Sequence, residues 1–429
     1  MACINKRGNT YRIIVSVGRD SAGKQLTKSC TFKPTEKTPK RIEKEVRRYA
    51  EEFEKKVLNG EYLDGEQITF DQFIEVWKTE WAAQKLTLRI QEEYADHLRL
   101  KASPVIGHMK LAKIKPLHIQ SIVTDLQKRG YAPKTIKYTY TAINSVLKYA
   151  YRMEVIATNP CDRVELPTMK NVSEMQFFTE DQAQRFLSFL YSGEYTKHYK
   201  EHTRTRKATG KTFVVKGYDE IRKIPLQHQV FFTLSIYGGF RRGELIALTW
   251  NDIDFRNKTV SINKSVSKTK YKQFEKDPKT AAGNRTIKLP DHCFSLLKKW
   301  QIKEKELCMK LGSKWEGYRG KEFDYNNIFI SMDSGRRMDV DTPTHVFKDY
   351  LLAYNDNCTL EDDKLPLIRL HDLRHTNATL LLGNGADIET VANRLGHEKA
   401  SVTLDIYGHA IEANDEAAAA TLEKLLAVN

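Results

Sequence analysis

The spacing of hydrophobic residues near the N-terminus predicts a small β-sheet covered by one helix. The run from Thr10 to Val17 is rich in β-forming residues, residues 18–23 are typical of a turn, and residues 24–32 should form the returning strand. From Thr38-Pro39 to Leu58 the apolar residues follow helical spacing, at Ile42, Val46, Tyr49, Phe53 and Val57. Residues 1–60 should therefore form a two- or three-stranded sheet with one helix.

A second segment, residues 68–160, has helical spacing throughout. Thr69 and Gln72 form a capping box that should begin its first helix, after a linker at 61–68. Further helices are expected at residues 88–101, 116–128 and 133–153. Pro104 should stop the first of these because a proline cannot continue an α-helix. The segment predicts an all-α domain, followed by a linker that extends to Glu174.

The third segment, residues 175–429, mixes helices with a small sheet. Thr179 should cap a helix, and a polar, basic stretch at 194–223 resembles a surface insertion. A helix is expected at 227–237, strands at 259–266 and 285–289, and a tail helix within 412–426. The predicted fold class is a multidomain α+β protein. Its domains are a sheet-plus-helix module (1–60), an all-α domain (68–160) and a mainly α domain with a small β-sheet (175–429).

The charge of the chain indicates what kind of partner it binds. The formal net charge is +15 over 429 residues, and residues 1–60 carry 15 lysines and arginines against 7 acidic residues. This balance favours nucleic acid before a membrane surface as the partner. A basic β-ribbon at the N-terminus could enter a DNA groove, although a packing module with a solvated charged face would have the same composition.

The cysteine pattern and the apolar segments indicate in which cellular compartment the protein works. None of the six cysteines forms a CxxC pair, which indicates neither a disulfide framework nor a zinc ribbon. No signal-peptide core and no run long enough for a membrane span is present. The sequence predicts a protein that works in the cytoplasm, where bacterial DNA is, with no membrane partner.

Four local patterns in residues 175–429 carry candidate chemistry. They are Gly239-Phe-Arg241-Arg242-Gly243-Glu244, Pro278-Lys279-Thr280 with Arg285 downstream, His371-Asp-Leu-Arg374-His375-Thr376, and Leu395-Gly396-His397 followed by Tyr407. Transfer of a DNA phosphodiester needs cations on the phosphate oxygens, a nucleophile and a proton donor. Arginine matches phosphate geometry, histidine and lysine can move protons, and tyrosine can attack covalently. The spacing i, i+3, i+4 should place His371, Arg374 and His375 on one helical face.

The ordered set of patterns resembles the catalytic domain of tyrosine recombinases, the phage integrase family. The basic N-terminal module and helical middle domain are similar to the layout of integrases from conjugative transposons and related elements. The resemblance implies that Tyr407 is the nucleophile, attacking to give a 3′-phosphotyrosyl link. It implies that Arg241 and Arg374 clamp the phosphate and that Lys279 protonates the leaving 5′-oxygen. It also implies that His371 assists proton transfer and that His397 binds the phosphate. Neither ATP, Mg²⁺ nor another cofactor is implied.

Alternatives remain at several positions. Lys270, Lys272 or Lys276 could replace Lys279, because all share one loop. Arg242, Glu244, His375 and His409 are expected to be structural, with Glu244 bracing Arg241 or capping a helix. A zinc site at His371, His375 and His397 is disfavoured, because Asp372 stands where the metalloprotease pattern has glutamate and Arg374 would adjoin the metal.

The resemblance further implies double-stranded DNA as the partner. It predicts a homotetramer on paired sites, an N-terminal module for flanking arm sites, a tail helix that docks on a neighbouring protomer, and an excisionase or DNA-bending protein as a further partner. Two alternative functions are a non-catalytic DNA-binding regulator with the same fold and a resolvase-type recombinase.

Overall fold

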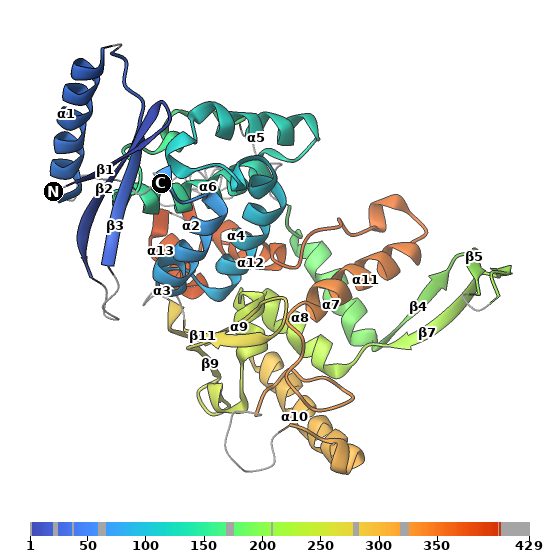
Figure 1. The fold of residues 1–429 in the computed structure, drawn as a ribbon. Helices are drawn as coiled ribbons and strands as arrows, with labels where there is room; N and C mark the ends of the chain where they lie inside the picture. Colours follow the sequence, from blue (N-terminus) through green and yellow to red (C-terminus); the bar gives the residue numbers. More distant parts are fainter. Residues whose placement is uncertain are drawn as a thin grey trace, which may run out of the picture. The chain divides into compact units, whose positions relative to one another are not determined.

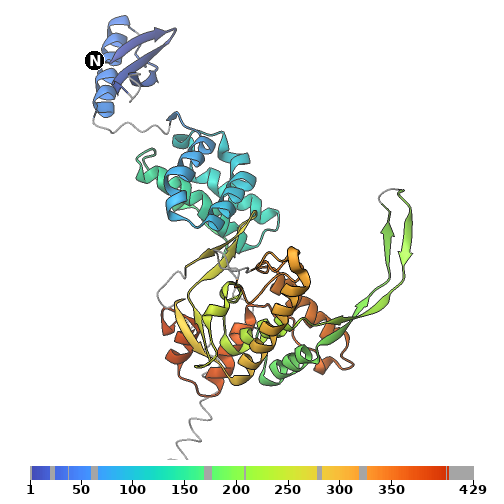
Figure 2. The same ribbon diagram turned by 90° about the horizontal axis from the view of Figure 1, so that it is seen from below.

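The computed structural model describes most of the chain, in two compact units, Met1–Asn171 and Val172–Asn429 (Figures 1 and 2). The described residues are 2–19, 25–36, 38–58, 66–168, 176–206, 209–277, 283–317, 326–401 and 403–404. Within these ranges no helix combines the length and apolar character that crossing a membrane requires. The division between the units falls in the stretch expected as a linker, and the three-domain division remains a prediction.

The N-terminal module contains the predicted sheet and helix. Its antiparallel strands have the order β1-β2-β3, and they are β1 (Cys3–Arg7), β2 (Thr10–Arg19) and β3 (Gln25–Phe32). Helix α1 (Pro39–Leu58) buries Val46, Ala50, Phe53 and Val57, and its core includes Ile13 and Val15 of β2. Residues two apart on a strand face the same side, so this pattern confirms the β-sheet packed on a helix.

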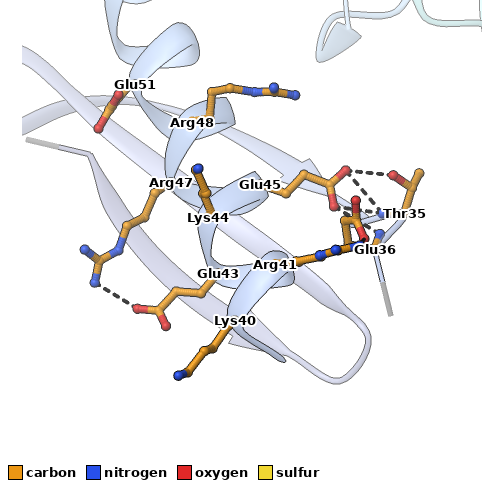
Figure 3. Close-up of a pocket in the computed structure, with 10 residues that line it drawn as sticks. All are labelled: Thr35, Glu36, Lys40, Arg41, Glu43, Lys44, Glu45, Arg47, Arg48 and Glu51. Carbon is orange, nitrogen blue, oxygen red and sulfur yellow. Dashed lines mark hydrogen bonds and ion pairs between the residues drawn. The ribbon is translucent and has the colours of Figure 1, made fainter. Parts of the chain in front are cut away.

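A surface cleft runs along the exposed side of α1, and some of its charged side chains form hydrogen bonds or ion pairs with other lining residues (Figure 3). Arg47 donates to Glu43 at 2.8 Å, and Glu45 accepts from the Thr35 hydroxyl at 2.8 Å and from the Thr35 and Glu36 backbone N–H groups. These hydrogen bonds lower the pKa of Glu45. Glu45 therefore fastens the start of α1 to the segment that follows β3.

The rest of the first unit is helical, and one prediction in it is wrong. The helices are α2 (Phe70–Trp77), η2 (Lys78–Ala82), α3 (Ala83–Lys85), α4 (Leu88–His97), η3 (Leu98–Gly107), η4 (Leu111–Lys113), α5 (Pro116–Lys128), α6 (Pro133–Arg152) and η5 (Pro160–Arg163). The Thr69–Gln72 capping box is confirmed. Pro104, however, does not end the helix after α4, because the backbone continues through it as the π-helical segment η3. A wider turn leaves more room for the proline ring, which in an α-helix clashes with the carbonyl of the preceding turn.

The second unit surrounds a central helix, α8 (Leu226–Gly238), whose residues are buried on nearly every side. It packs against α7 (Glu180–Ser192), α9 (Arg242–Ala247), α10 (Asp291–Leu311) and α12 (Asp372–Gly383). The Thr179 cap of α7 is confirmed. The other helices are η6 (Trp250–Asp252), η8 (Gly312–Lys314), α11 (Thr342–Asp356), η9 (Glu361–Asp363) and α13 (Ile388–Leu395). Because helices pack against α8 on nearly every side, the position of the turn at its C-terminal end is fixed.

Small antiparallel sheets flank these helices. One has the order β12-β9-β8, from β8 (Ile253–Asp254), β9 (Thr259–Ile262) and β12 (Arg285–Lys288). The single strand expected at 259–266 is instead two, since β9 ends at Ile262 and β10 (Ser265–Lys268) begins a separate hairpin with β11 (Gln273–Lys276). This hairpin occupies part of the expected lysine-rich loop. The turn after β9 lets the chain leave one sheet and begin another.

The stretch predicted as an insertion forms a long two-stranded ribbon. Strand β4 (Glu194–Tyr199) pairs with β7 (Tyr218–Lys223), and β5 (His202–Thr205) pairs with β6 (Thr212–Val215) beyond them. The ribbon projects away from the helices of its own unit in both views (Figures 1 and 2). The residues of β5 are all exposed. Sequence reasoning placed the insertion at the surface but found no strands in it, because its few apolar residues do not alternate.

Candidate active site

The first arginine of the candidate site is held by the turn between α8 and α9. Gly239 follows α8 with φ +61°, and a Cβ there would lie 2.7 Å from the Asn377 Oδ1 and Leu395 Cδ2 atoms. Only glycine fits both this backbone conformation and this close approach. Arg241 then caps α9, with its N–H donating to Glu244 Oε2 at 2.9 Å and its Nη1 to Oε1 at 2.8 Å. The expectation that Glu244 braces Arg241 is confirmed.

The second arginine, Arg374, lies on α12 and is buried, with 2% of its surface exposed. Its Nη1 donates to the Gly239 carbonyl at 2.8 Å and its Nη2 to the Leu395 carbonyl at 2.6 Å. Arg241 Nη2 donates to the next carbonyl, that of Gly396, at 3.3 Å. Two guanidinium groups that are 133 positions apart in the sequence thus meet at adjacent peptide groups.

The histidines of the predicted set lie around these arginines. His371 directly precedes α12, and Arg374 and His375 lie in the first turn of that helix. All three residues therefore lie at the start of α12, and the Arg374 side chain is buried and donates to carbonyls inside the unit. The His371 and His375 rings lie 5.2 Å apart at 86°. Burial, followed by the charges of His375 and Arg374, lowers the pKa of His371 to about 4.

His397 follows Gly396, whose left-handed backbone ends α13. Its Nδ1 lies 2.8 Å from the Thr403 hydroxyl, which fixes the orientation of the ring. Burial, followed by the charges of Arg374 and Arg241, lowers the pKa of His397 to about 4. At neutral pH both His371 and His397 are therefore neutral, and each ring offers one donor and one acceptor nitrogen.

A third arginine joins the site from the sheet. Arg285, the first residue of β12, donates to Glu244 through Nη2 at 2.7 Å and Nη1 at 3.3 Å, and through Nε to the Arg394 carbonyl at 2.8 Å. Burial alone would raise the pKa of Glu244, but Arg285 and Arg241 hold it below its ordinary value. One carboxylate is thus shared between two guanidinium groups.

Some residues had no role in the sequence analysis. Asn377, one turn after Arg374 on α12, donates to the Ile236 carbonyl at 2.7 Å and to the Tyr237 carbonyl at 3.2 Å. Arg394 Nη2 donates to the same Tyr237 carbonyl at 2.8 Å. These side chains hold the end of α8. Sequence spacing alone could not identify them, because their partners are backbone atoms of distant segments.

Two predicted residues, Lys279 and Tyr407, lie outside the described residues, as do His409 and the expected tail helix at 412–426. Of the alternative lysines, Lys276 ends β11, and Lys270 and Lys272 lie at the β10–β11 turn. Arg242, expected to be structural, contacts the Thr344 hydroxyl at 2.8 Å and Asp341 at 3.1 Å. The site roles therefore remain predictions, and the described geometry shows how Arg241, Arg374 and His397 are held and where His371 lies.

The described part of the site suits an anion. Arg241 and Arg285 share the Glu244 carboxylate, and Arg374 lies with them near His397, which leaves an excess of positive charge beside neutral imidazoles. Planar guanidinium groups hold phosphate oxygens in pairs, and a half-exposed one such as Arg241 can reach a large ligand. In the described ranges, no group of three or more His, Cys, Asp or Glu side chains is arranged to hold a metal ion, so the zinc alternative gains no support.

Comparisons with known proteins agree with this chemistry. The sequence profile of the Phage integrase family matches residues 214–414, and that of the Phage integrase central domain matches residues 70–166. The chain is 26% identical to a tyrosine recombinase XerC-like protein of Caldanaerobacter subterraneus subsp. tengcongensis, over 97% of this chain and 96% of that protein. It is 25% identical to the ICEBs1 integrase of Bacillus subtilis, over 74% of this chain and 72% of that protein.

Solved structures share the fold. The Tn1549 transposon integrase in complex with a circular intermediate DNA has a TM-score of 0.61 at 18% identity, covering 84% of this chain and 100% of that chain. A lambda integrase dimer bound to a core site has a TM-score of 0.51 at 14% identity, covering 96% of this chain and 95% of that chain. Both neighbours are integrases bound to DNA.

Proposed function

We propose that this protein breaks and rejoins DNA through a transient bond to Tyr407. The reason is that the chain belongs to the phage integrase family of tyrosine recombinases. The enzyme is an integrase of the type found in conjugative transposons and related elements. It would integrate and excise such an element. The observation that carries the proposal is the meeting of Arg241 and Arg374 at the adjacent carbonyls of Leu395 and Gly396, beside His397.

Arg241 and Arg374 would bind the non-bridging oxygens of the scissile phosphate. Their charge opposes the negative charge that increases on those oxygens as the nucleophile attacks, and such fixed charges act without reorganising in the transition state. Because Arg374 is anchored by two carbonyls and Arg241 by Glu244, both guanidinium groups are positioned before DNA arrives. His397 would donate a hydrogen bond to the same phosphate.

Tyr407 would supply the nucleophile. Its Oη forms a bond to phosphorus while the bond from phosphorus to the 5′-oxygen breaks, which leaves a 3′-phosphotyrosyl link and a free 5′-hydroxyl. His371 would accept the tyrosyl proton, as a neutral imidazole can, and Lys279 would donate a proton to the leaving oxygen. In the second step the 5′-hydroxyl of another strand attacks the link and releases Tyr407. The phosphotyrosine keeps the bond energy, so the proposal includes no nucleotide or metal cofactor.

The assembly proposed for this reaction is a homotetramer on two double-stranded DNA sites. The basic N-terminal module would bind separate arm sites, and the linked domains would raise the effective concentration of each at the DNA. The tail residues 412–426 would dock on a neighbouring protomer, and an excisionase or bending protein would set direction. The enzyme would work on bacterial DNA in the cytoplasm.

The proposal is tested with a plasmid that carries two copies of the element end, incubated with the full chain in EDTA. Recombinant product with wild type and none with Tyr407→Phe is expected. Clear binding to the element end without recombination or cleavage by wild type would favour the regulator alternative. Deleting residues 413–429 should impair recombination of paired sites more than binding to one site, and unchanged strand exchange would refute the docking role of the tail.

A further inference from the structure

We infer that Arg285 is a positioning residue for the recombination reaction, which sets Arg241 through Glu244 and sets the Gly396–His397 turn through the Arg394 carbonyl. The inference rests on the proposed function. Arg285 does not itself need to touch DNA, because only 7% of its side chain is exposed. Its effect would pass through the groups that it holds.

The fork of Arg285 reaches three separate segments. Nη2 and Nη1 bind the two oxygens of Glu244 on α9, Nε binds the Arg394 carbonyl at the end of α13, and Nη1 also binds the Gly283 carbonyl at 3.2 Å. Gly283 is the first described residue after Lys279. A planar guanidinium fixes the directions of its N–H groups, so movement of one segment disturbs the other contacts.

The shared carboxylate explains how Arg285 acts on Arg241. Glu244 accepts the Arg241 N–H, the Arg241 Nη1 and both terminal nitrogens of Arg285. With Arg285 present, the negative charge of Glu244 is shared between the positive charges of Arg285 and Arg241. The remaining positive charge lies toward Arg241, whose side chain is 41% exposed. Without Arg285, Glu244 would neutralise Arg241 alone or become protonated and release it. Either change would weaken a phosphate clamp.

Whether Glu244 is charged or protonated in a variant without Arg285 depends on pH. The pH dependence of cleavage therefore distinguishes a positioning role of Arg285 from simple support of the fold. Glu244 is faced by Arg241 from the start of its own helix and by Arg285 from β12, with Arg394 of α13 and His397 nearby. Removing Arg285 removes the main group that stabilises the charged carboxylate, so the pKa of Glu244 should rise. Cleavage by such a variant should then improve in part as pH rises, because ionised Glu244 braces Arg241 again, but it should stay below wild type because Glu244 then neutralises Arg241 alone.

The test measures single-turnover cleavage of a nicked duplex carrying the element end, with the full chain, from pH 5 to 8. The variants are Arg285→Lys, Arg285→Gln and the double variant Glu244→Gln with Arg285→Gln. The control is Arg336→Gln, which breaks an exposed ion pair of the same unit with Glu316. DNA binding and thermal unfolding are measured on each variant.

Arg285→Gln should cleave about 100-fold more slowly at pH 6, the size expected when a catalytic group is misplaced by about 1 Å. Its rate should recover in part as pH rises, with a slope that wild type lacks. The double variant should be slow without that slope, and Arg285→Lys should be slowed without it, since its charge remains. DNA binding should stay within a few-fold of wild type.

Two results would overturn the inference while leaving the proposed function intact. They are cleavage by Arg285→Gln at the wild-type rate, and a slowed rate whose pH profile runs parallel to that of wild type. If Arg285→Gln does not fold, Arg285→Lys decides, and a wild-type rate for that variant overturns the inference. If wild type itself cleaves no DNA, the proposed function fails and the inference falls with it.

Discussion

Arg241 and Arg374 donate to neighbouring carbonyls, those of Gly396 and Leu395, at 3.3 and 2.6 Å. The backbone between α13 and His397 therefore sets the separation of the two guanidinium groups. Because this peptide also carries His397, one short segment positions both arginines and one imidazole. A change in that segment should be felt at all three side chains, and the arginines should tolerate substitution poorly.

We expect Arg374→Lys to slow DNA cleavage by about 100- to 1,000-fold, the range that loss of one transition-state contact typically costs. Lysine cannot bind the Gly239 and Leu395 carbonyls together as Arg374 does. Affinity for the DNA site should change by only a few-fold. Single-turnover cleavage and a binding titration measure the two effects. Arg256→Lys, at an exposed arginine of the same unit, is the matched control and should behave as wild type. Equal rates for Arg374→Lys and the control would contradict this role.

DNA binding should be accompanied by proton uptake at the site. Without DNA the pKa of His397 is about 4, and a nearby phosphate would raise it, because an opposite charge favours the protonated ring. Between pH 4 and the raised pKa, the complex then holds more protons than its free components, so affinity should increase as pH falls. Calorimetry in buffers of different ionisation enthalpy measures the uptake. His397→Asn should reduce the uptake, whereas Asn at the exposed His345 should not. Identical uptake in both variants would place the phosphate elsewhere.

A buried acid outside the site should make stability depend on pH. Glu304 on α10 accepts from Trp250 Nε1 at 2.7 Å, and burial raises its pKa to about 7. The folded state therefore binds a proton that the unfolded state has already released between about pH 4.5 and 7, so this residue makes the fold less stable as pH rises. Glu304→Gln keeps an acceptor for Trp250 and removes the charge.

The expected gain from Glu304→Gln at pH 8 is on the order of 1–3 kcal/mol in the free energy of unfolding, and it should shrink toward pH 5. Thermal or denaturant unfolding at the two pH values measures it. Glu306→Gln, on an exposed side chain of the same helix, should have little effect at either pH. An equal effect of Glu304→Gln at pH 5 and pH 8 would argue against burial as the cause.

The ribbon should be dispensable for folding. Tyr199 and Tyr218 face each other across β4 and β7, so replacing residues 200–217 with Asn-Gly should close a two-residue hairpin there. Of the described residues in this stretch, most have exposed side chains and none belongs to the hydrophobic core. Thermal unfolding should change by at most about 2 °C, as is usual for surface changes. A much larger loss would mean that the outer strands support the unit.

Local signals in the sequence sufficed for most helices and for the N-terminal sheet. The caps at Thr69 and Thr179 and the spacing along α1 depend on neighbouring residues only, and those predictions are confirmed. Pro104 was misjudged because its cost depends on whether the surrounding helix can widen into a π-helical turn. The strands of the ribbon were missed because exposed strands lack the alternation of apolar residues that marks a buried one.

How much of the candidate site could be predicted from the sequence differs from residue to residue. Arg241, Arg374 and His397 stand in short patterns, so sequence alone was enough to propose them as candidates. The bracing by Glu244 followed from its position three residues after Arg241 and is confirmed. The contacts of Arg285 and Asn377 could not be predicted, because they join carbonyls more than 100 residues away. Such contacts exist only once the chain has folded.

The central claim is that Tyr407 forms a covalent bond to DNA. We would incubate the full chain with a nicked suicide duplex of the element end in EDTA and analyse a denaturing gel, with Tyr271→Phe as a control at an exposed tyrosine. The account predicts a covalent protein–DNA band for wild type and Tyr271→Phe, and none for Tyr407→Phe, which should still bind the duplex. A band that persists in Tyr407→Phe would contradict the assignment of the nucleophile, and no band from DNA-bound wild type would contradict the reaction itself.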